Sequence, residues 1–273
     1  MDKYDEIARH ARSMRELVLY MGKHAGKHAA HIGGALSIVD VLAVLYFDVA
    51  NVVRVGMKSR ERDRIILSKG HASLGLYSAL IESGIMPSEL KDTFEDDNSL
   101  LLGHPVQDPE IGIEFTNGSL GMGLSLGIGV AIACKRNGLK NKVYVILGDG
   151  ECDEGSCWEA FMAAGQFKLD NLIAIVDRNG FQLSGSTEEV MSQADIDKRI
   201  TAFGWETVVC NGHDIRQLSE VLLKHDHVDR PLAIVMDTVK GKGFSFSEGN
   251  NAWHHTIVTQ KLYEQGVAEL ESM

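Results

Sequence analysis

The chain has few of the features that mark linkers, leaders or membrane anchors. Its 273 residues include only 4 prolines and no tract rich in serine and proline, so a disordered tail is not expected. Residues 1–6 have neither a basic segment nor an apolar one, which argues against a signal peptide. The most apolar window, residues 38–53, is interrupted by Asp40, Asp48 and Asn51, so we expect no membrane span.

Cysteine and positive charge are also scarce. The four cysteines, Cys134, Cys152, Cys157 and Cys210, form no C-x-x-C pair, so reduced thiols and a cytoplasmic location are expected. The chain has 27 Lys and Arg against 38 Asp and Glu, a formal net charge of −11, which repels phosphate backbones and argues against nucleic-acid binding. An anionic cofactor would therefore need a binding site that offsets this negative charge locally, such as a metal ion or a cluster of hydrogen-bond donors.

What the sequence does contain is an alternation of strand-like and helix-like segments. Apolar periodicity predicts helices over residues 7–21, 36–48, 74–82, 118–137, 156–167, 214–224 and 256–270. Continuous apolar runs predict strands at residues 64–68, 143–147, 172–176, 207–210 and 232–236. Such runs are typical of parallel strands covered on both faces. We therefore predict an α/β fold, a doubly wound and mostly parallel sheet with helices on both faces, in one domain covering residues 1–273.

Polar residues and glycines follow several of the predicted strands. In a doubly wound sheet the chemistry collects at the carboxyl ends of the strands. Those ends carry residues 69–71, 148–150, 177–179 and 240–243. One edge of the sheet is thus expected to gather glycines, a carboxylate, an amide and a histidine. Residues 86–117, which hold three of the four prolines, look irregular.

Asp149 and Asn179 are candidate magnesium ligands. They follow two neighbouring apolar strands and are 30 positions apart in the sequence, about the length of a βαβ unit that returns the chain to the same edge. Mg²⁺ prefers a few oxygen ligands and completes its shell with phosphate oxygens. Gly150 permits close approach of a diphosphate, and Gly180 permits a sharp turn that offers a main-chain carbonyl. The alternative is a tight strand-to-helix turn in which Asp149 is a capping residue.

These motifs resemble a known family. Residues 148–150, Glu154 with Gly155, and residues 171–179 are similar to the thiamine diphosphate fingerprint, and its transketolase form is the best match. The resemblance implies a thiamine diphosphate-binding fold of the diphosphate-binding (PP) type. It also implies that Asp149, Asn179 and the main-chain oxygen of Phe181 hold Mg²⁺, which in turn holds the diphosphate.

Four histidines each resemble a transketolase histidine in its own motif: His31 in H-I-G-G-A-L-S, His71 in L-S-K-G-H, His104 in G-H-P, and His254 after Trp253. The resemblance implies that His71 and His254 face the diphosphate and the reacting carbon. It implies that His31 and His104 bind substrate hydroxyls and assist proton transfer, for which the pKa of imidazole is suited. The remaining histidines match no family motif: His10, His24, His28, His213, His225, His227 and His255. We interpret His225 and His227 as a solvated helix end rather than a metal site.

Residues 118–123 read G-S-L-G-M-G, which resembles the loop that supports the cofactor's two rings through Gly118, Ser119 and Leu120. Its spacing differs from the dinucleotide fingerprint, and close helix packing by small residues is the alternative. The commonest full-length transketolases have Pro and Gln where this chain has Ser119 and Met122.

Three charged positions leave alternatives open. Glu154 resembles a buried acid at the subunit contact near the cofactor, although an exposed acid at a helix N-terminus would look the same. Lys240 and Lys242 would offset cofactor charge, but a solvated loop fits them equally well.

The resemblance implies transfer of a two-carbon ketol unit from a ketose to an aldose. Because the sequence ends after one domain, it looks like the amino-terminal subunit of a split transketolase. The implied partner carries the pyrimidine-binding and C-terminal domains, with a glutamate that activates the cofactor, in an α₂β₂ assembly. The alternatives are the α subunit of a 2-oxo acid dehydrogenase, a synthase, or a regulatory subunit without activity. The sequence pattern is the same whether the substrate is a phosphorylated, a sulfonated or a branched sugar.

Overall fold

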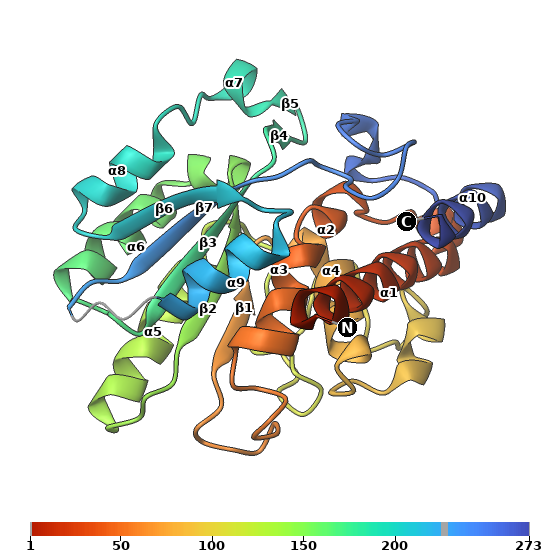
Figure 1. Cartoon of the computed structure of the whole chain (residues 1–273). Coiled ribbons are helices and arrows are strands. Elements are labelled where there is room, and N and C mark those ends of the chain that lie inside the picture. The colour runs from red at the N-terminus through yellow and green to blue at the C-terminus, as the bar shows by residue number, and fades with distance from the viewer. Residues whose placement is uncertain (1, 225–228, 273) are drawn as a thin grey trace.

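A computed structural model describes residues 2–224 and 229–272, and its centre is a parallel five-stranded sheet (Figure 1). The strands, in spatial order, are β1 (Arg64–Leu67), β2 (Val143–Gly148), β3 (Leu172–Arg178), β7 (Leu232–Asp237) and β6 (Glu206–Asn211). All four pairings are parallel. The five predicted strands are therefore confirmed, each within two residues of its expected ends.

Helices cover both faces of this sheet, which confirms the doubly wound arrangement. Alternate strand residues enter two separate apolar clusters, so that Ile146 and Ile175 belong to one and Val145 and Ala174 to the other. The first cluster is completed by α1 (Lys3–His24), α3 (Val39–Val44), α4 (Ser73–Glu82) and α9 (Ile215–Lys224). The second is completed by α5 (Gly123–Arg136), α6 (Gly155–Gln166) and α8 (Ile196–Ala202).

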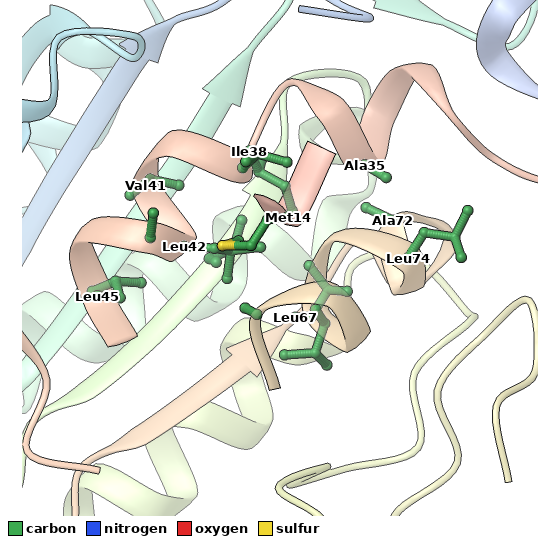
Figure 2. Close-up of a cluster of buried hydrophobic side chains, with 14 of the residues drawn as sticks. Met14, Ala35, Ile38, Val41, Leu42, Leu45, Leu67, Ala72 and Leu74 are labelled. Atoms are coloured by element: carbon green, nitrogen blue, oxygen red, sulfur yellow. The ribbon is translucent and has the colours of Figure 1, made fainter. Parts of the chain in front are cut away.

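The first cluster forms where α1 lies across α3 and α4. The residues that recur along α1 with helical spacing, such as Met14 and Val18, are fully buried. Figure 2 shows Met14 among Leu42 of α3, Leu67 of β1 and Leu74 of α4. Burying an apolar side chain of this size contributes roughly 1.5–3 kcal/mol. The last helix, α10 (Gln260–Glu271), packs beside α1 on the outside (Figure 1).

Several predicted helices have different bounds. Residues 36–48 were expected to be one helix, but the structure has α2 (Gly33–Leu36), a turn, α3, and then a π-helical turn (Leu45–Val49). The break lies at Ser37, whose hydroxyl donates to the carbonyl of Gly34 at 3.1 Å and to Asp177 at 2.8 Å. Such side-chain bonds compete with the helical backbone pattern. The helix expected from residue 118 begins only at Gly123, because Gly121 has φ +83°, which a right-handed helix does not contain.

Smaller segments complete the chain. The 3-10 turns are Gly26–His28, Gly70–Ala72, Ser88–Thr93, Gly150–Asp153 and Asn251–His254. After β3 the chain forms an antiparallel hairpin, β4 (Phe181–Gln182) with β5 (Gly185–Ser186), followed by α7 (Thr187–Val190). The last predicted helix begins at Gln260 instead of residue 256, because Thr256 pairs its backbone with Ala30. This pairing fastens the segment before α10 to the segment before α2.

Two further expectations bear on the environment of the chain. In residues 2–224 and 229–272, no helix combines the length and the apolar character that crossing a bilayer demands. The four cysteines all lie within these residues, are buried, and are unpaired.

Candidate active site

A cavity of about 380 Å³ lies at the carboxyl ends of β1, β2, β3 and β7, where the sequence placed the chemistry. Eleven of the thirteen predicted site residues line it: His71, His104, Gly118, Leu120, Asp149, Gly150, Glu154, Asn179, Phe181, Lys240 and His254. His31 does not line this cavity directly but contacts histidines that do. Ser119 is exposed and lines a neighbouring depression beside His104.

Asp149 is a buried carboxylate held by main-chain donors. Its side chain accepts N–H bonds from Gly150 at 2.9 Å and from Gly180 at 2.7 Å, and the residue is 1% exposed. Burial, and then the charge of Asp177, raises its pKa to about 6. Within the described part of the chain it forms no ion pair, so a cation at this position would compensate the charge.

Asn179 has a fixed amide orientation. Its Nδ2 donates to Asp177 at 2.7 Å, and its Oδ1 accepts the N–H of Phe181 at 3.1 Å. An amide oxygen has two lone pairs, so Oδ1 retains one. Gly180 has φ +79°, which lets the chain turn directly after Asn179. The carboxylate of Asp149 and the amide oxygen of Asn179 are thereby brought to neighbouring strand ends.

Sequence reasoning missed the buried ion pair that supports this corner. Nζ of Lys69 lies 2.5 Å from Asp177, and the two side chains are 1% and 0% exposed. Burial alone raises the pKa of Asp177, but the Lys69 charge, with donors from Thr238 and Ser37, holds it below its ordinary value. Asp177 therefore stays ionised and orients Asn179. The signal was present, since Lys69 and Asp177 stand in two of the polar strand-end groups.

The four predicted histidines form one cluster, and three of them, His71, His104 and His254, line the cavity. The ring centre of His31 lies 5.5 Å from those of His71 and His104 and 5.4 Å from that of His254. The rings of His71 and His254 are also 5.4 Å apart. These residues come from four segments that are separated by up to 223 positions in the sequence, 254 − 31. The grouping predicted from separate motifs is thus present in the fold.

Three of these imidazoles are held in the neutral form. Burial, followed by the charges of His255 and His254, lowers the pKa of His31 to about 3. Burial and the charge of Lys240 lower the pKa of His254 to about 4. The pKa of His71 is lowered well below its ordinary value by burial and by Lys69. A neutral imidazole offers one donor and one acceptor, which is the complement of a hydroxyl group.

His255 is a further histidine at this site, and no family motif pointed to it. Its ring centre is 4.5 Å from that of His31. The backbone pairing of Ala30 with Thr256 brings the two rings together, because it places His31 opposite His255. The other histidines without a motif lie elsewhere. His10 and His24 contact Glu82 and Asp96, His28 is exposed, and His213 contacts Asp40; His225 and His227 lie outside the described residues.

Lys240 is buried, so the solvated-loop interpretation is wrong for this residue. It is 1% exposed, and its Nζ lies 2.8 Å from Oδ1 of Asn251 and 3.0 Å from Nδ1 of His254. Burial, and then the charge of Lys69, lowers its pKa to about 8. Because an ammonium only donates, Nδ1 of His254 accepts and the ring proton lies on Nε2. Lys242, by contrast, is half-exposed and pairs with Glu248.

The two acids of the turn after β2 have opposite environments. Glu154 is exposed on this chain at the start of α6, whereas Glu151 is the buried acid, at 3% exposure. Glu151 accepts the N–H of Gly121 at 2.9 Å, the N–H of Gly148 at 3.0 Å, and the hydroxyl of Ser68. It therefore ties the Gly118–Gly121 loop to the ends of β1 and β2.

The cavity has features that fit a diphosphate with Mg²⁺. Oε1 of Gln182, on the cavity wall, is buried and has no hydrogen-bond partner. A Cβ atom at position 150 would lie 2.8 Å from Cβ of Gln182, which is too close. Only glycine therefore lets the main chain at position 150 lie this near to Gln182. Within the described residues no group of three or more His, Cys, Asp and Glu side chains is placed to hold a metal. Ligands at this corner would instead be one carboxylate, one amide and main-chain or phosphate oxygens, a set that Mg²⁺ accepts.

Comparisons with known proteins agree with this geometry. Residues 8–271 match the family model described as transketolase, thiamine diphosphate binding domain. The chain is 44% identical over 243 residues to one of the subunits of apulose-4-phosphate transketolase from Phocaeicola vulgatus, covering 89% of this chain and 86% of that one. It is 40% identical to the protein of the same name from Actinobacillus succinogenes, covering 98% and 97%. It is 39% identical to a 6-deoxy-6-sulfo-D-fructose transketolase subunit of Clostridium sp., covering 97% and 96%.

Solved structures give the same result. The fold matches transketolase from Campylobacter jejuni with a TM-score of 0.89 at 28% identity, and transketolase from Leishmania mexicana with 0.88 at 26%. Each match covers 97% of this chain but only 42% and 41% of the solved chains. The chain therefore spans about two fifths of these structures.

Proposed function

Because the chain belongs to the transketolase family, we propose that it is the diphosphate-binding subunit of a two-chain transketolase that moves a two-carbon ketol unit from a ketose to an aldose. The observation that carries the proposal is the convergence of four histidines on the cavity that Asp149 and Asn179 line. Relatives that this chain covers over 86–97% of their length are named as subunits, which supports a partner chain.

The cofactor of this domain family is thiamine diphosphate. We propose that Asp149, Asn179 and the main-chain oxygen of Phe181 hold Mg²⁺, and that the metal neutralises the diphosphate. When bound, thiamine diphosphate supplies the carbanion chemistry that breaks and forms the carbon–carbon bond. The protein contributes binding, orientation and proton positions.

Because the net charge of the chain is −11, an anionic cofactor needs positive charge close to its binding site, and Lys240 supplies it. Lys69 is already neutralised by Asp177, whereas Nζ of Lys240 contacts an amide oxygen and an imidazole and lies 5.9 Å from the centre of the Phe181 ring. Its ammonium is thus free of a carboxylate partner within the described residues. This favours binding of the diphosphate at the side of the cavity that Lys240 lines, since an anion placed near an unpaired buried cation gains attraction in a low dielectric.

The histidines then divide the remaining work. His254 accepts from Lys240 at Nδ1, which leaves its Nε2–H as a donor for a carbonyl or hydroxyl oxygen. His71 lines the same cavity and is neutral, so it holds or moves a proton near the reacting atoms. We assign His31 and His104 to substrate hydroxyls, because His104 is exposed and its ring centre lies 5.5 Å from that of His31.

The partner and setting complete the proposal. We propose that residues 1–273 are one domain, because both apolar clusters pack on one sheet. The partner would carry the pyrimidine-binding and C-terminal domains in a cytoplasmic α₂β₂ enzyme. Met122 directly precedes α5 and is 48% exposed, and Met162 lies on α6 and is 55% exposed. Such a partner would cover both apolar side chains. Gly118, Leu120 and Glu154 line the cavity, Ser119 lines the depression beside it, and these residues would support the cofactor rings at that contact.

Reconstitution tests the proposal. The chain is purified and assayed for ketol transfer on a panel of phosphorylated, sulfonated and branched ketoses, with and without the product of the adjacent gene. We expect turnover only from the mixture, in the presence of thiamine diphosphate and Mg²⁺. Full turnover by the isolated chain would contradict the two-chain enzyme, and failure to bind thiamine diphosphate would contradict the cofactor assignment.

A further inference from the structure

The segment that carries Lys240 is fastened at both of its flanks by one hydrogen-bond network. Val239, on one side, donates its main-chain N–H to Nε2 of His213 at 2.8 Å. On the other side the carbonyl of Lys242 accepts from Nε of Arg15 at 3.2 Å. These two partners come from the turn after β6 and from α1, so the segment is tied to two distant parts of the fold.

Both fastening residues converge on Asp40 of α3. Nδ1 of His213 lies 2.8 Å from Oδ2 of Asp40, and Nη2 of Arg15 donates to the same oxygen at 2.6 Å. The side chains of Arg15, Asp40 and His213 are only 10%, 7% and 13% exposed. Burial by itself raises the pKa of Asp40, but the Arg15 charge and the hydrogen bonds from His213 and Arg15 hold that pKa below its ordinary value. Asp40 is therefore an ionised acceptor.

The partners of His213 fix its tautomer. An ionised Asp40 accepts, so Nδ1 of His213 carries the proton; Val239 N–H donates, so Nε2 carries the lone pair. Gly212 lets this turn lie against the segment, because a Cβ there would lie 2.4 Å from Cγ2 of Thr238. The close approach and the two oriented hydrogen bonds together place an acceptor at Val239 N–H.

We propose that His213 is a positioning residue, which holds the main chain at Val239 so that the ammonium of Lys240 points into the cavity toward an anionic diphosphate. Asp40 sets the tautomer that makes His213 an acceptor, and Arg15 fixes the other flank. This inference rests on the proposed function for the identity of the anion, but not for the contact between His213 and Val239. No family motif pointed to His213, because its action is carried through a main-chain amide.

Two substitutions of His213 each replace one of the two imidazole nitrogens with an amide atom, so they separate the roles of the two nitrogens. In His213→Gln the side-chain oxygen reaches about the place of Nε2 and accepts from Val239, but the donor to Asp40 is lost. In His213→Asn the amide nitrogen takes about the place of Nδ1 and donates to Asp40, but Val239 loses its acceptor. His24→Asn, at a half-exposed histidine whose Nε2 contacts Asp96, is the matched control.

The first measurement is hydrogen exchange of peptides covering residues 238–243, in the full chain assembled with its partner. We expect faster exchange in His213→Asn and near-wild-type exchange in His213→Gln and His24→Asn. The second is the affinity for thiamine diphosphate at saturating Mg²⁺, followed by calorimetric titration. Loss of one hydrogen bond predicts about 3- to 10-fold weaker binding in His213→Asn, with recovery to within about twofold in His213→Gln.

Other outcomes would overturn the inference. If His213→Asn matches the wild type in exchange and affinity, Val239 does not need the acceptor. If His213→Asn stays closer to the wild type in exchange and affinity than His213→Gln does, the contact with Asp40 is what matters. If both variants lose affinity equally and both have a lowered melting temperature, His213 has a purely structural role. If the wild type itself binds no thiamine diphosphate, the proposed function fails, while the exchange comparison still decides whether His213 holds the segment.

Discussion

The main-chain N–H of Gly180 donates to Oδ2 of Asp149 at 2.7 Å, a bond between residues 31 positions apart. It joins the turn after β3 to the turn after β2, and so it places Asn179 beside the carboxylate. Gly150 donates to the other oxygen, Oδ1, at 2.9 Å. Two donors from two strand ends thus fix the carboxylate while leaving lone pairs for a cation.

The first prediction concerns the metal. Asp149→Ala or Asn179→Ala should abolish retention of thiamine diphosphate, because the diphosphate would lose the Mg²⁺ that neutralises it within an acidic protein. The measurement is calorimetric titration of the assembled enzyme with the cofactor and Mg²⁺. Asp195→Ala, at an exposed residue whose carboxylate pairs with Lys198, is the control and should bind as the wild type does. Unchanged affinity in both site variants would remove these two residues from the ligand set.

The second prediction concerns the histidines. His71→Ala and His254→Ala should each lower turnover by about 10²- to 10⁴-fold, the usual contribution of a positioned proton-transfer group. The melting temperature should change little, because both rings border the cavity. Steady-state kinetics and thermal unfolding measure the two effects, with His24→Ala as the control. Equal losses of turnover in all three variants would indicate damage to the fold instead of to the chemistry.

The arrangement of the sheet was predictable because its strands are buried on both faces. Residues such as Val143 to Leu147 form an unbroken apolar run, and no polar residue interrupts the signal. The hairpin β4–β5 was missed since two-residue strands show no periodicity. The true start of α5 was also missed, because the left-handed φ of Gly121 is a property of the folded loop that a glycine in the sequence only permits.

The place of the cavity was predictable where polar residues follow the end of a strand, as Asp149 and Asn179 do. The role of a residue was not predictable where it depends on the direction in which its side chain points in the folded protein. Glu151 and Glu154 stand three positions apart in the same turn, yet the first points inward to Gly121 and the second outward. His255 joins the histidine cluster through a backbone pairing between distant segments, for which the sequence has no local signal.

The third prediction concerns pH. The pKa of Lys240 is lowered to about 8 in the free protein, so its ammonium loses its proton as the pH rises through 8. Binding of an anion favours the charged form, so affinity for the diphosphate should be highest below pH 8 and fall above it. Lys240→Gln should bind more weakly at pH 7 and show a smaller decline between pH 7 and 9.5. Titrations at several pH values measure this. Parallel curves for the two proteins would show that Lys240 does not contribute its charge.

The last prediction concerns Glu151. Its two carboxylate oxygens accept from Gly121 N–H, Gly148 N–H and the Ser68 hydroxyl, and all of these groups are buried. Glu151→Ala would leave these donors without a partner inside the protein, at about 1–3 kcal/mol for an unsatisfied donor. Three donors lose their partner, so we expect a total loss of about 3–5 kcal/mol in the free energy of unfolding.

Glu154→Ala is the matched control for Glu151→Ala, three positions away in the same turn. Glu154 is exposed and caps α6 without a side-chain hydrogen bond, so its removal should change the free energy of unfolding by less than about 0.5 kcal/mol. Urea unfolding of the purified chain measures both variants. The Glu151 variant should also weaken cofactor binding, because the Gly118–Gly121 loop loses its tie to β1 and β2. A larger loss of stability from Glu154→Ala than from Glu151→Ala would show that the buried acid has been misassigned.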